Sequence, residues 1–128
     1  MSKQLLWSLE FENAQGTPPN SEFWNHDIGD GTNSGIPGWG NQEREFYLDS
    51  AVAEDGLGNL VIQAHKVGVE DDDPNTELDC YYGKAEWTSG KITTLGKVSF
   101  QYGRIEARIR MPQGNGTWPA FWLLGSDM

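Results

Sequence analysis

Two tryptophans in the last fifteen residues form the strongest candidate for a binding surface. Trp118 and Trp122 flank Ala120 within the run 116–125. Residues two and four apart on a β-strand share a face, so the two indoles would lie on one surface with a hollow between them. Flat aromatic faces stack on bodies with apolar faces and polar rims, as sugar rings have. The pattern predicts a platform for two sugar units, and the alternative is that both indoles are core aromatics.

The turn around Trp39 is a second candidate. Glycine stands on both sides of the indole, at Gly38 and Gly40, which favours a loop that presents the ring. The amides of Asn41 and Gln42 follow directly, and an amide offers both donors and an acceptor to a hydroxyl group. The alternative is an ordinary turn without a ligand.

Paired carboxylates are the third feature that could do chemistry, because glycoside hydrolysis needs two of them. Glu43 and Glu45 are two residues apart, and so are Glu77 and Asp79, so each pair would share a strand face. The alternative for both pairs is solvated surface charge. The sequence has no Ser-His-Asp set, P-loop, dinucleotide-binding glycine pattern or EF-hand loop.

Composition excludes several classes of protein. The 128 residues carry a net charge of −10, which argues against nucleic-acid binding and against a basic membrane anchor. No apolar run is long enough to span a bilayer. The only cysteine, Cys80, is expected to be buried and inert, or alternatively paired between chains. His26 and His65 lie far apart, so a zinc site is not expected.

Alternation with a period of two residues predicts an all-β chain in one antiparallel sandwich or barrel. In 104–111 the apolar residues occupy one face, and in 43–49 Phe46 and Leu48 lie on the core side. The run 118–124 reads as a strand buried on both faces. Turns are expected at 29–35, 56–59 and 112–116, and the acidic stretch 69–79 as a solvated, mobile loop. Strands are predicted within 43–49, 59–65, 87–94, 98–102, 104–111 and 118–124.

Several motifs, in order, resemble glycoside hydrolase family 16 and within it the laminarinase-like endo-β-1,3-glucanases. The C-terminal runs 103–112 and 114–125 are the most specific. The pattern Trp-Gly-Asn-x-Glu-x-x-x-Tyr at 39–47 is similar to a second motif of the family. The similarity extends from about residue 7 to residue 128, with further matches at 9–11, Trp24, 58–62 and 88–94.

The resemblance implies a β-jelly-roll sandwich of the concanavalin A-like lectin and glucanase type, with a substrate cleft on its concave face. It implies hydrolysis of internal β-1,3-glucosidic bonds of laminarin-type or mixed-linkage glucans with retention. The family's carboxylates lie in Glu-x-Asp-x-x-Glu or Glu-x-Asp-x-Glu, soon after the Trp-Pro-Ala-Phe-Trp segment, and alternation places them on the cleft face. The sequence reaches Met128 before that motif, so the catalytic carboxylates are expected after Met128.

We therefore expect residues 1–128 to form the N-terminal part of a single, incomplete family 16 domain, with no catalytic residue and no activity alone. The missing C-terminal half is the partner that this expectation implies. The alternative is a non-catalytic carbohydrate-binding β-sandwich module, and a third reading is a structural domain without a ligand.

The resemblance also implies the residues that bind substrate. Trp118 and Trp122 match cleft-floor tryptophans, Asn41 matches a residue that contacts distal sugars, and Trp39 lies beside it. Lys91 stands where laminarinases usually have Arg; Lys can donate to a hydroxyl but lacks the planar fork. The expected substrate-binding set is Trp39, Asn41, Lys91, Trp118 and Trp122.

No cofactor is expected to be required. Many family members bind a structural Ca²⁺, and the resemblance places backbone carbonyls of Glu10 and Gly58 among its ligands; two carbonyls alone would hold it poorly. The expected partner is a β-glucan polysaccharide or oligosaccharide, with no nucleic acid and no membrane. Carbohydrate substrate and acidic charge favour an extracellular location, while the first residues show no signal peptide, which leaves a cytoplasmic protein or a removed leader.

Overall fold

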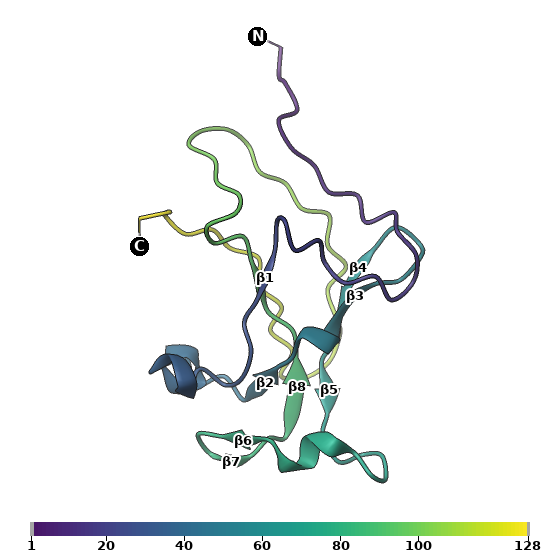
Figure 1. The fold of residues 1–128 in the computed structure, drawn as a ribbon, viewed down its shortest axis with the longest axis vertical. Helices are drawn as coiled ribbons and strands as arrows, with labels where there is room; N and C mark the ends of the chain where they lie inside the picture. The colour runs from purple at the N-terminus through teal and green to yellow at the C-terminus, as the bar shows by residue number, and fades with distance from the viewer. Residues whose placement is uncertain (1, 128) are drawn as a thin grey trace.

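The computed structural model describes residues 2–127, and within them it is all-β, with short strands joined by 3-10 turns (Figure 1). The turns are η1 (Thr32–Ser34), η2 (Pro37–Gly40), η3 (Asp49–Ala51) and η4 (Pro74–Glu77). The strands are β1 (Asn25–His26), β2 (Glu45–Tyr47), β3 (Val52–Glu54), β4 (Leu60–Ile62), β5 (His65–Lys66), β6 (Asp79–Cys80), β7 (Gly83–Lys84), β8 (Trp87–Ser89) and β9 (Ile92–Thr93).

The largest sheet has the order β2-β8-β5. β2 runs parallel to β8, with Glu45 opposite Trp87 and Tyr47 opposite Ser89. β5 runs antiparallel to β8 and places Lys66 opposite Trp87. Because residues directly opposite each other share a face of the sheet, this register fixes which side chains lie together. Three two-stranded sheets accompany it: β1 with β9, β3 with β4, and β6 with β7.

A small core lies on one side of β8. Val52 of β3 is 2% exposed, and Thr88 of β8 is also buried. A Cβ added to Gly90 would collide with the Val52 side chain. Gly90 therefore faces Val52, and Thr88, two residues earlier, is buried on the same side. Alternation along this extended segment directs Trp87, Ser89 and Lys91 to the opposite face.

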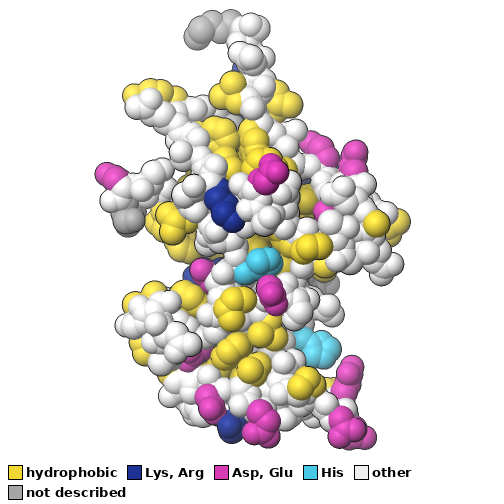
Figure 2. All heavy atoms as spheres, viewed as in Figure 1, with side chains coloured by type: hydrophobic (Ala, Val, Ile, Leu, Met, Phe, Trp, Pro, Cys, Tyr) yellow, Lys and Arg dark blue, Asp and Glu magenta, His cyan; other side chains and the backbone are white. Residues whose placement is uncertain are grey.

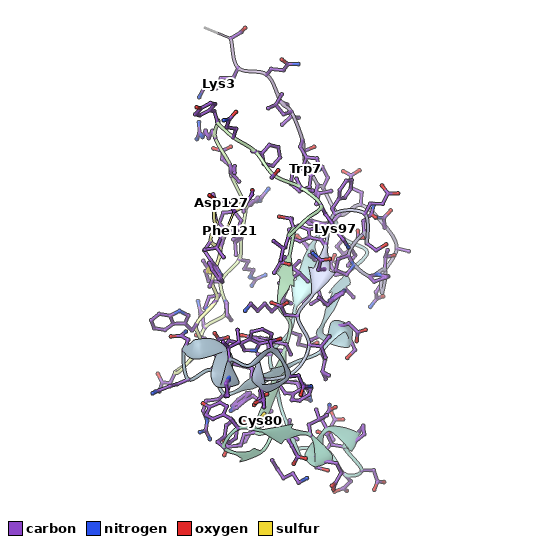
Figure 3. All side chains as sticks on the ribbon, turned by 60° about the vertical axis from the view of Figure 1, so that its left-hand side comes forward. Lys3, Trp7, Cys80, Lys97, Phe121 and Asp127 are labelled. Atoms are coloured by element: carbon purple, nitrogen blue, oxygen red, sulfur yellow. The ribbon has the colours of Figure 1, made fainter. Side chains whose placement is uncertain are left out.

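Polar anchors hold the N-terminal arm against the strands. The Glu54 carboxylate, buried in β3, accepts hydrogen bonds from the backbone and side-chain nitrogens of Asn13. The Lys97 ammonium donates to the carbonyls of Ser21 and Trp24, at 2.7 and 2.9 Å. Trp7 packs on Phe23 and Phe100, with ring centroids 5.7 and 5.8 Å away, and it lies on the same half of the molecule as Lys97 (Figure 3).

Much of the local prediction is confirmed. The segment 43–49 contains β2, with Phe46 and Leu48 half-buried, and 56–59 is the turn of the β3–β4 hairpin. The segments 59–65 and 87–94 each hold two strands where one was predicted, and the second break falls at Gly90-Lys91. The acidic stretch 69–79 is more ordered than predicted, because Asp73 accepts from Asn75 and caps η4.

Three predicted strands are wrong as paired strands. The segments 98–102, 104–111 and 118–124 contain no strand, and no backbone hydrogen bond is found within 99–127. The run 118–124 is exposed rather than buried on both faces. The physical reason is that alternation specifies an extended backbone, whereas a strand also needs a neighbouring backbone, and no described segment lies along these three as a ladder partner.

The surface has exposed apolar residues and a cluster of acidic residues. Acidic side chains gather at the end formed by η4, β6 and β7, and apolar side chains spread across the centre of the same view (Figure 2). Cys80 lies at that end, half-buried rather than fully buried, and burial raises the pKa of its thiol. Within residues 2–127, no helix has the length and apolar character to cross a bilayer.

Candidate functional site

Lys91 lies at the centre of a cluster of aromatic rings. Its Nζ is 4.2 Å from the centroid of the Trp39 ring and 5.8 Å from that of Tyr47. The Trp122 ring centroid is 6.0 Å away, so a segment distant in the sequence reaches the same point. The faces of aromatic rings attract cations at these distances. The cluster combines flat apolar faces with a hydrogen-bond donor, which suits a ligand that has C–H faces and hydroxyl rims.

Strand pairing places Lys91 beside an acidic partner. In the β1–β9 ladder His26 lies opposite Ile92, and the next pair outward is Asp27 and Lys91, where the Asp27 amide donates to the Lys91 carbonyl at 2.9 Å. The Lys91 Nζ lies 3.5 Å from the Asp27 carboxylate, and both side chains are half-buried. Asp27 therefore limits where the ammonium can lie.

The turn that carries Trp39 has a constrained backbone. Gly38 and Trp39 both have positive φ, 61° and 55°, which is an unusual conformation for a tryptophan. Gly31 also has positive φ, and a Cβ there would collide with the Ile36 carbonyl oxygen and approach the Trp39 nitrogen. Glycine is thus required at position 31 for the loop to close beneath the indole.

A buried carboxylate fixes the same loop. Asp30 accepts from the Thr32 amide and hydroxyl, at 3.0 and 2.9 Å, and from the Tyr81 amide at 2.6 Å. Burial acts to raise the pKa of Asp30, but these hydrogen bonds outweigh it and hold the pKa below its ordinary value. The charged form of Asp30 ties the Trp39 loop to the backbone next to β6.

Tyr47 joins the cluster to a carboxylate. Its ring centroid is 6.1 Å from that of Trp39, and its hydroxyl donates to Glu43. Burial, and then the hydrogen bond to Glu43, raise the pKa of Tyr47 far above its ordinary value, so the hydroxyl stays protonated as a donor. The Glu43 carboxylate is thereby engaged within the cluster. In the other pair, Glu77 and Asp79 are exposed beside Lys84, as solvated charge.

The predicted position of the catalytic carboxylates lies outside the described residues. The sequence predicted no catalytic residue within 1–128 and placed the carboxylate motif after Met128. The structure describes residues 2–127, so Met128 itself and everything expected after it fall beyond that range. Of the two carboxylate pairs inside the range, Glu43, Glu77 and Asp79 have the other engagements given above. The placement of the catalytic motif after Met128 stays a prediction.

The structure unites part of the predicted substrate-binding set. Trp39, Lys91 and Trp122 come together. Asn41 lies exposed at the end of the Trp39 turn, where its backbone N–H donates to the Gly38 carbonyl. Trp118 is 88% exposed and Trp122 is 59% exposed, so neither indole is buried among residues 2–127. Among the described residues, no contact with Lys91 is found for Trp118.

Asp27 and Tyr47 were not predicted as members of the site. Asp27 has no local signal, because only the β1–β9 register brings it to Lys91. The spacing of Tyr47 from Trp39 and Glu43 in the 39–47 motif could have indicated Tyr47 as a candidate. That spacing alone does not show which residues Tyr47 contacts.

The backbone carbonyls of Glu10 and Gly58 stay a prediction as calcium ligands. Glu10 lines a hollow of about 270 Å³ together with Glu54, whereas Gly58 lies in the β3–β4 turn. Within the described chain, no group of three or more His, Cys, Asp or Glu side chains could hold a metal ion. Two backbone carbonyls alone are too few oxygen ligands for calcium, and no step below depends on one.

Comparison with known proteins identifies the family. The family model for glycosyl hydrolases family 16 matches residues 41–128, so the chain belongs to that family. It is similar to the beta-glucanase of Rhodothermus marinus, 38% identical over 123 residues, which cover 94% of this chain and 36% of that protein. It is also 33% identical to the glucan endo-1,3-beta-glucosidase A1 of Niallia circulans, covering 96% of this chain and 17% of that protein.

A solved structure supports the same assignment of fold. The laminarinase catalytic domain of Thermotoga maritima MSB8 superposes with a TM-score of 0.61 and 40% identity, over 78% of this chain and 35% of that one. The likeness confirms the predicted jelly-roll class. The chain spans about a third of the length of the Rhodothermus marinus protein and of the solved laminarinase domain.

Proposed function

We propose that the complete domain hydrolyses internal β-1,3-glucosidic bonds of β-glucans with retention, and that residues 1–128 supply the part of the cleft that grips the sugar chain. The observation that carries the proposal is the cluster of Trp39, Lys91 and Trp122 in a chain that belongs to family 16. The linkage is supported by relatives named for β-1,3-glucan hydrolysis.

Binding follows from the chemistry of the cluster. The exposed indole of Trp122, and that of Trp118 on the same segment, offer flat faces on which pyranose rings can stack. The Lys91 ammonium and the Asn41 amide can donate to sugar hydroxyls. Asp27 and the Trp39 face hold Lys91 in place before the sugar arrives, which lowers the entropy lost on binding.

The bond-breaking step needs a carboxylate pair, about 5 to 5.5 Å apart for retention. The 128 residues contain neither Glu-x-Asp-x-x-Glu nor Glu-x-Asp-x-Glu. Glu43 is engaged with Tyr47, and Glu77 and Asp79 lie beside Lys84 at the other end of the molecule. We assign the nucleophile and the acid/base to residues after Met128 that complete the domain. We assign substrate binding to residues 1–128.

Two assays test the proposal. The complete domain should release reducing sugar from laminarin, with the anomeric configuration retained in the first product. The 128-residue chain should bind laminari-oligosaccharides, seen as a change in tryptophan fluorescence, and release none. Cello-oligosaccharides, which have β-1,4 bonds, serve as the control ligand.

The outcomes separate the proposed hydrolase from a carbohydrate-binding module. Hydrolysis of laminarin by the complete domain supports the proposal, whereas binding by both proteins with hydrolysis by neither identifies a carbohydrate-binding module. A complete domain that neither binds nor cleaves laminarin refutes the proposal.

Trp122→Ala should weaken binding about tenfold if the indole is a hot spot. Tyr102→Ala is the matched control, because Tyr102 is an aromatic residue 83% exposed outside the cluster.

A further inference from the structure

Lys91 lies two residues beyond the end of β8 (Trp87–Ser89), and β8 begins with a second exposed tryptophan. Thr88 is buried and Gly90 faces Val52 in the core, so alternation places Trp87, Ser89 and Lys91 on the opposite side of this segment. Trp87 is 40% exposed. At about 3.3 Å per residue, Trp87 lies roughly 13 Å along the chain from Lys91. It is on the same face as the candidate site but beyond the reach of the same sugar unit.

Strand register places two polar side chains on either side of Trp87. Glu45 of β2 and Lys66 of β5 both lie directly opposite it, and therefore on its face of the sheet. Neither side chain has an ion-pair partner within residues 2–127. An aromatic platform thus lies between a donor and an acceptor, which is the chemistry that recognises a sugar ring and its hydroxyls.

A hollow lies against two of these side chains, Trp87 and Lys66. It has a volume of about 480 Å³, and Lys66, Trp87, Thr76 and Glu86 are among the residues that line it. Small-molecule sites commonly have volumes of about 300 to 1,000 Å³, so the space accommodates a sugar unit. The hollow is open on one side, as a site that receives part of a longer chain must be.

We propose that the sugar-binding face extends along β8 and ends in a further subsite at Trp87, flanked by Glu45 and Lys66, which receives the distal part of a long β-glucan chain. The inference rests on the proposed function, since it takes the ligand of the Lys91 cluster as its own. It adds a length requirement: a short oligosaccharide fills only the cluster around Lys91, and a longer one also reaches Trp87.

The test measures affinity against oligosaccharide length. The 128-residue chain is titrated with laminari-oligosaccharides from laminaribiose to laminarihexaose by calorimetry. For the unaltered chain, affinity should continue to rise with length. Trp87→Ala should bind laminarihexaose about tenfold more weakly, corresponding to one lost aromatic anchor, and laminaribiose unchanged. Trp87→Phe should retain most of the affinity for laminarihexaose, because it keeps an aromatic platform.

Control variants distinguish a failure of the Trp87 subsite from a failure of the proposed function. Trp39→Ala should weaken binding of short and long chains alike, and Tyr102→Ala should change neither. If Trp87→Ala leaves laminarihexaose affinity unchanged, or weakens laminaribiose equally, the subsite is refuted while the Lys91 cluster stands. If the unaltered chain binds no laminari-oligosaccharide, the proposed function itself fails, and the subsite fails with it.

Discussion

The Trp39 turn and the Trp118 segment present indoles by opposite means. The Trp39 ring is half-buried, packs on Lys91 and Tyr47, and belongs to a loop tied down by buried Asp30. Trp118 is 88% exposed in extended chain without backbone hydrogen bonds. In the first region the position of the ring is determined before a ligand arrives. In the second, nothing within residues 2–127 fixes the ring.

The difference teaches how each region should respond to mutation. Where a ring is held by packing and hydrogen bonds, its removal costs folding stability as well as affinity. Where a ring stands free, its removal can cost affinity alone. The first region is also pre-organised, so less conformational entropy is lost when a ligand binds there. The predictions below test this contrast, in order of decreasing effect.

The largest effect is expected from Gly31→Ala. The added Cβ would collide with the Ile36 carbonyl, and alanine is strained at the positive φ of this residue. We expect a loss of about 2 to 4 kcal/mol in the free energy of unfolding. Denaturant unfolding followed by tryptophan fluorescence measures it.

Gly35→Ala is the control for that variant. Gly35 also has positive φ, but nothing lies within 4 Å of an added Cβ, so only the backbone strain is tested. We expect a loss of about 1 kcal/mol. Equal losses for the two variants would contradict the view that the close approach at Gly31 shapes the Trp39 loop.

Asp30→Asn should cost about 1 to 3 kcal/mol, because a buried acceptor of three hydrogen bonds is weakened. It should also remove a pH dependence. The pKa of Asp30 is lowered in the folded chain, so its contribution is complete above the ordinary value of 3.8 and is lost as pH falls through the folded pKa.

Measuring the free energy of unfolding between pH 6 and pH 2 tests the Asp30 prediction. The unaltered chain should lose more stability over this range than Asp30→Asn does. Parallel pH profiles for the two proteins would show that the charge of Asp30 does not hold the loop.

Lys91→Met should weaken laminari-oligosaccharide binding about fivefold, since it removes a donor and a cation held over Trp39. Lys91→Arg should retain the affinity, because guanidinium stacks on aromatic rings and pairs with carboxylates such as Asp27. Calorimetry distinguishes the variants. Equal affinities for all three proteins would remove Lys91 from the site.

The smallest effect on stability is expected at Trp118. Trp118→Ala should leave the free energy of unfolding within about 0.5 kcal/mol of the unaltered chain, because the ring is exposed. Trp39→Ala, by contrast, should cost both stability and affinity. A large loss of stability in Trp118→Ala would show that the Trp118 ring is also fixed by packing, and would contradict the difference between the two regions.

Sequence alone predicted the class of fold and named three residues that meet in the cluster, Trp39, Lys91 and Trp122. Alternation located β2 and β4, and β-rich composition located β8. Glycine placement located the Trp39 turn and the β3–β4 hairpin. Strands were over-predicted at 104–111 from alternation, at 98–102 from composition and at 118–124 from an apolar run. These local patterns favour an extended backbone but do not report the neighbour that pairs with it. Asp27 was missed for a related reason, since its meeting with Lys91 depends on the β1–β9 register.

The sequence by itself determined which residue types could meet a sugar: indoles with neighbouring amides, and an ammonium among aromatic residues. These are properties of composition and short spacing, which the chain carries wherever it folds. Only the tertiary structure decided that Trp39, Lys91 and Trp122 converge, that Asp30 clamps the loop, and that Glu45 and Lys66 flank Trp87. These contacts join residues far apart in the chain, and strand register and loop closure fix them, which local periodicity does not encode.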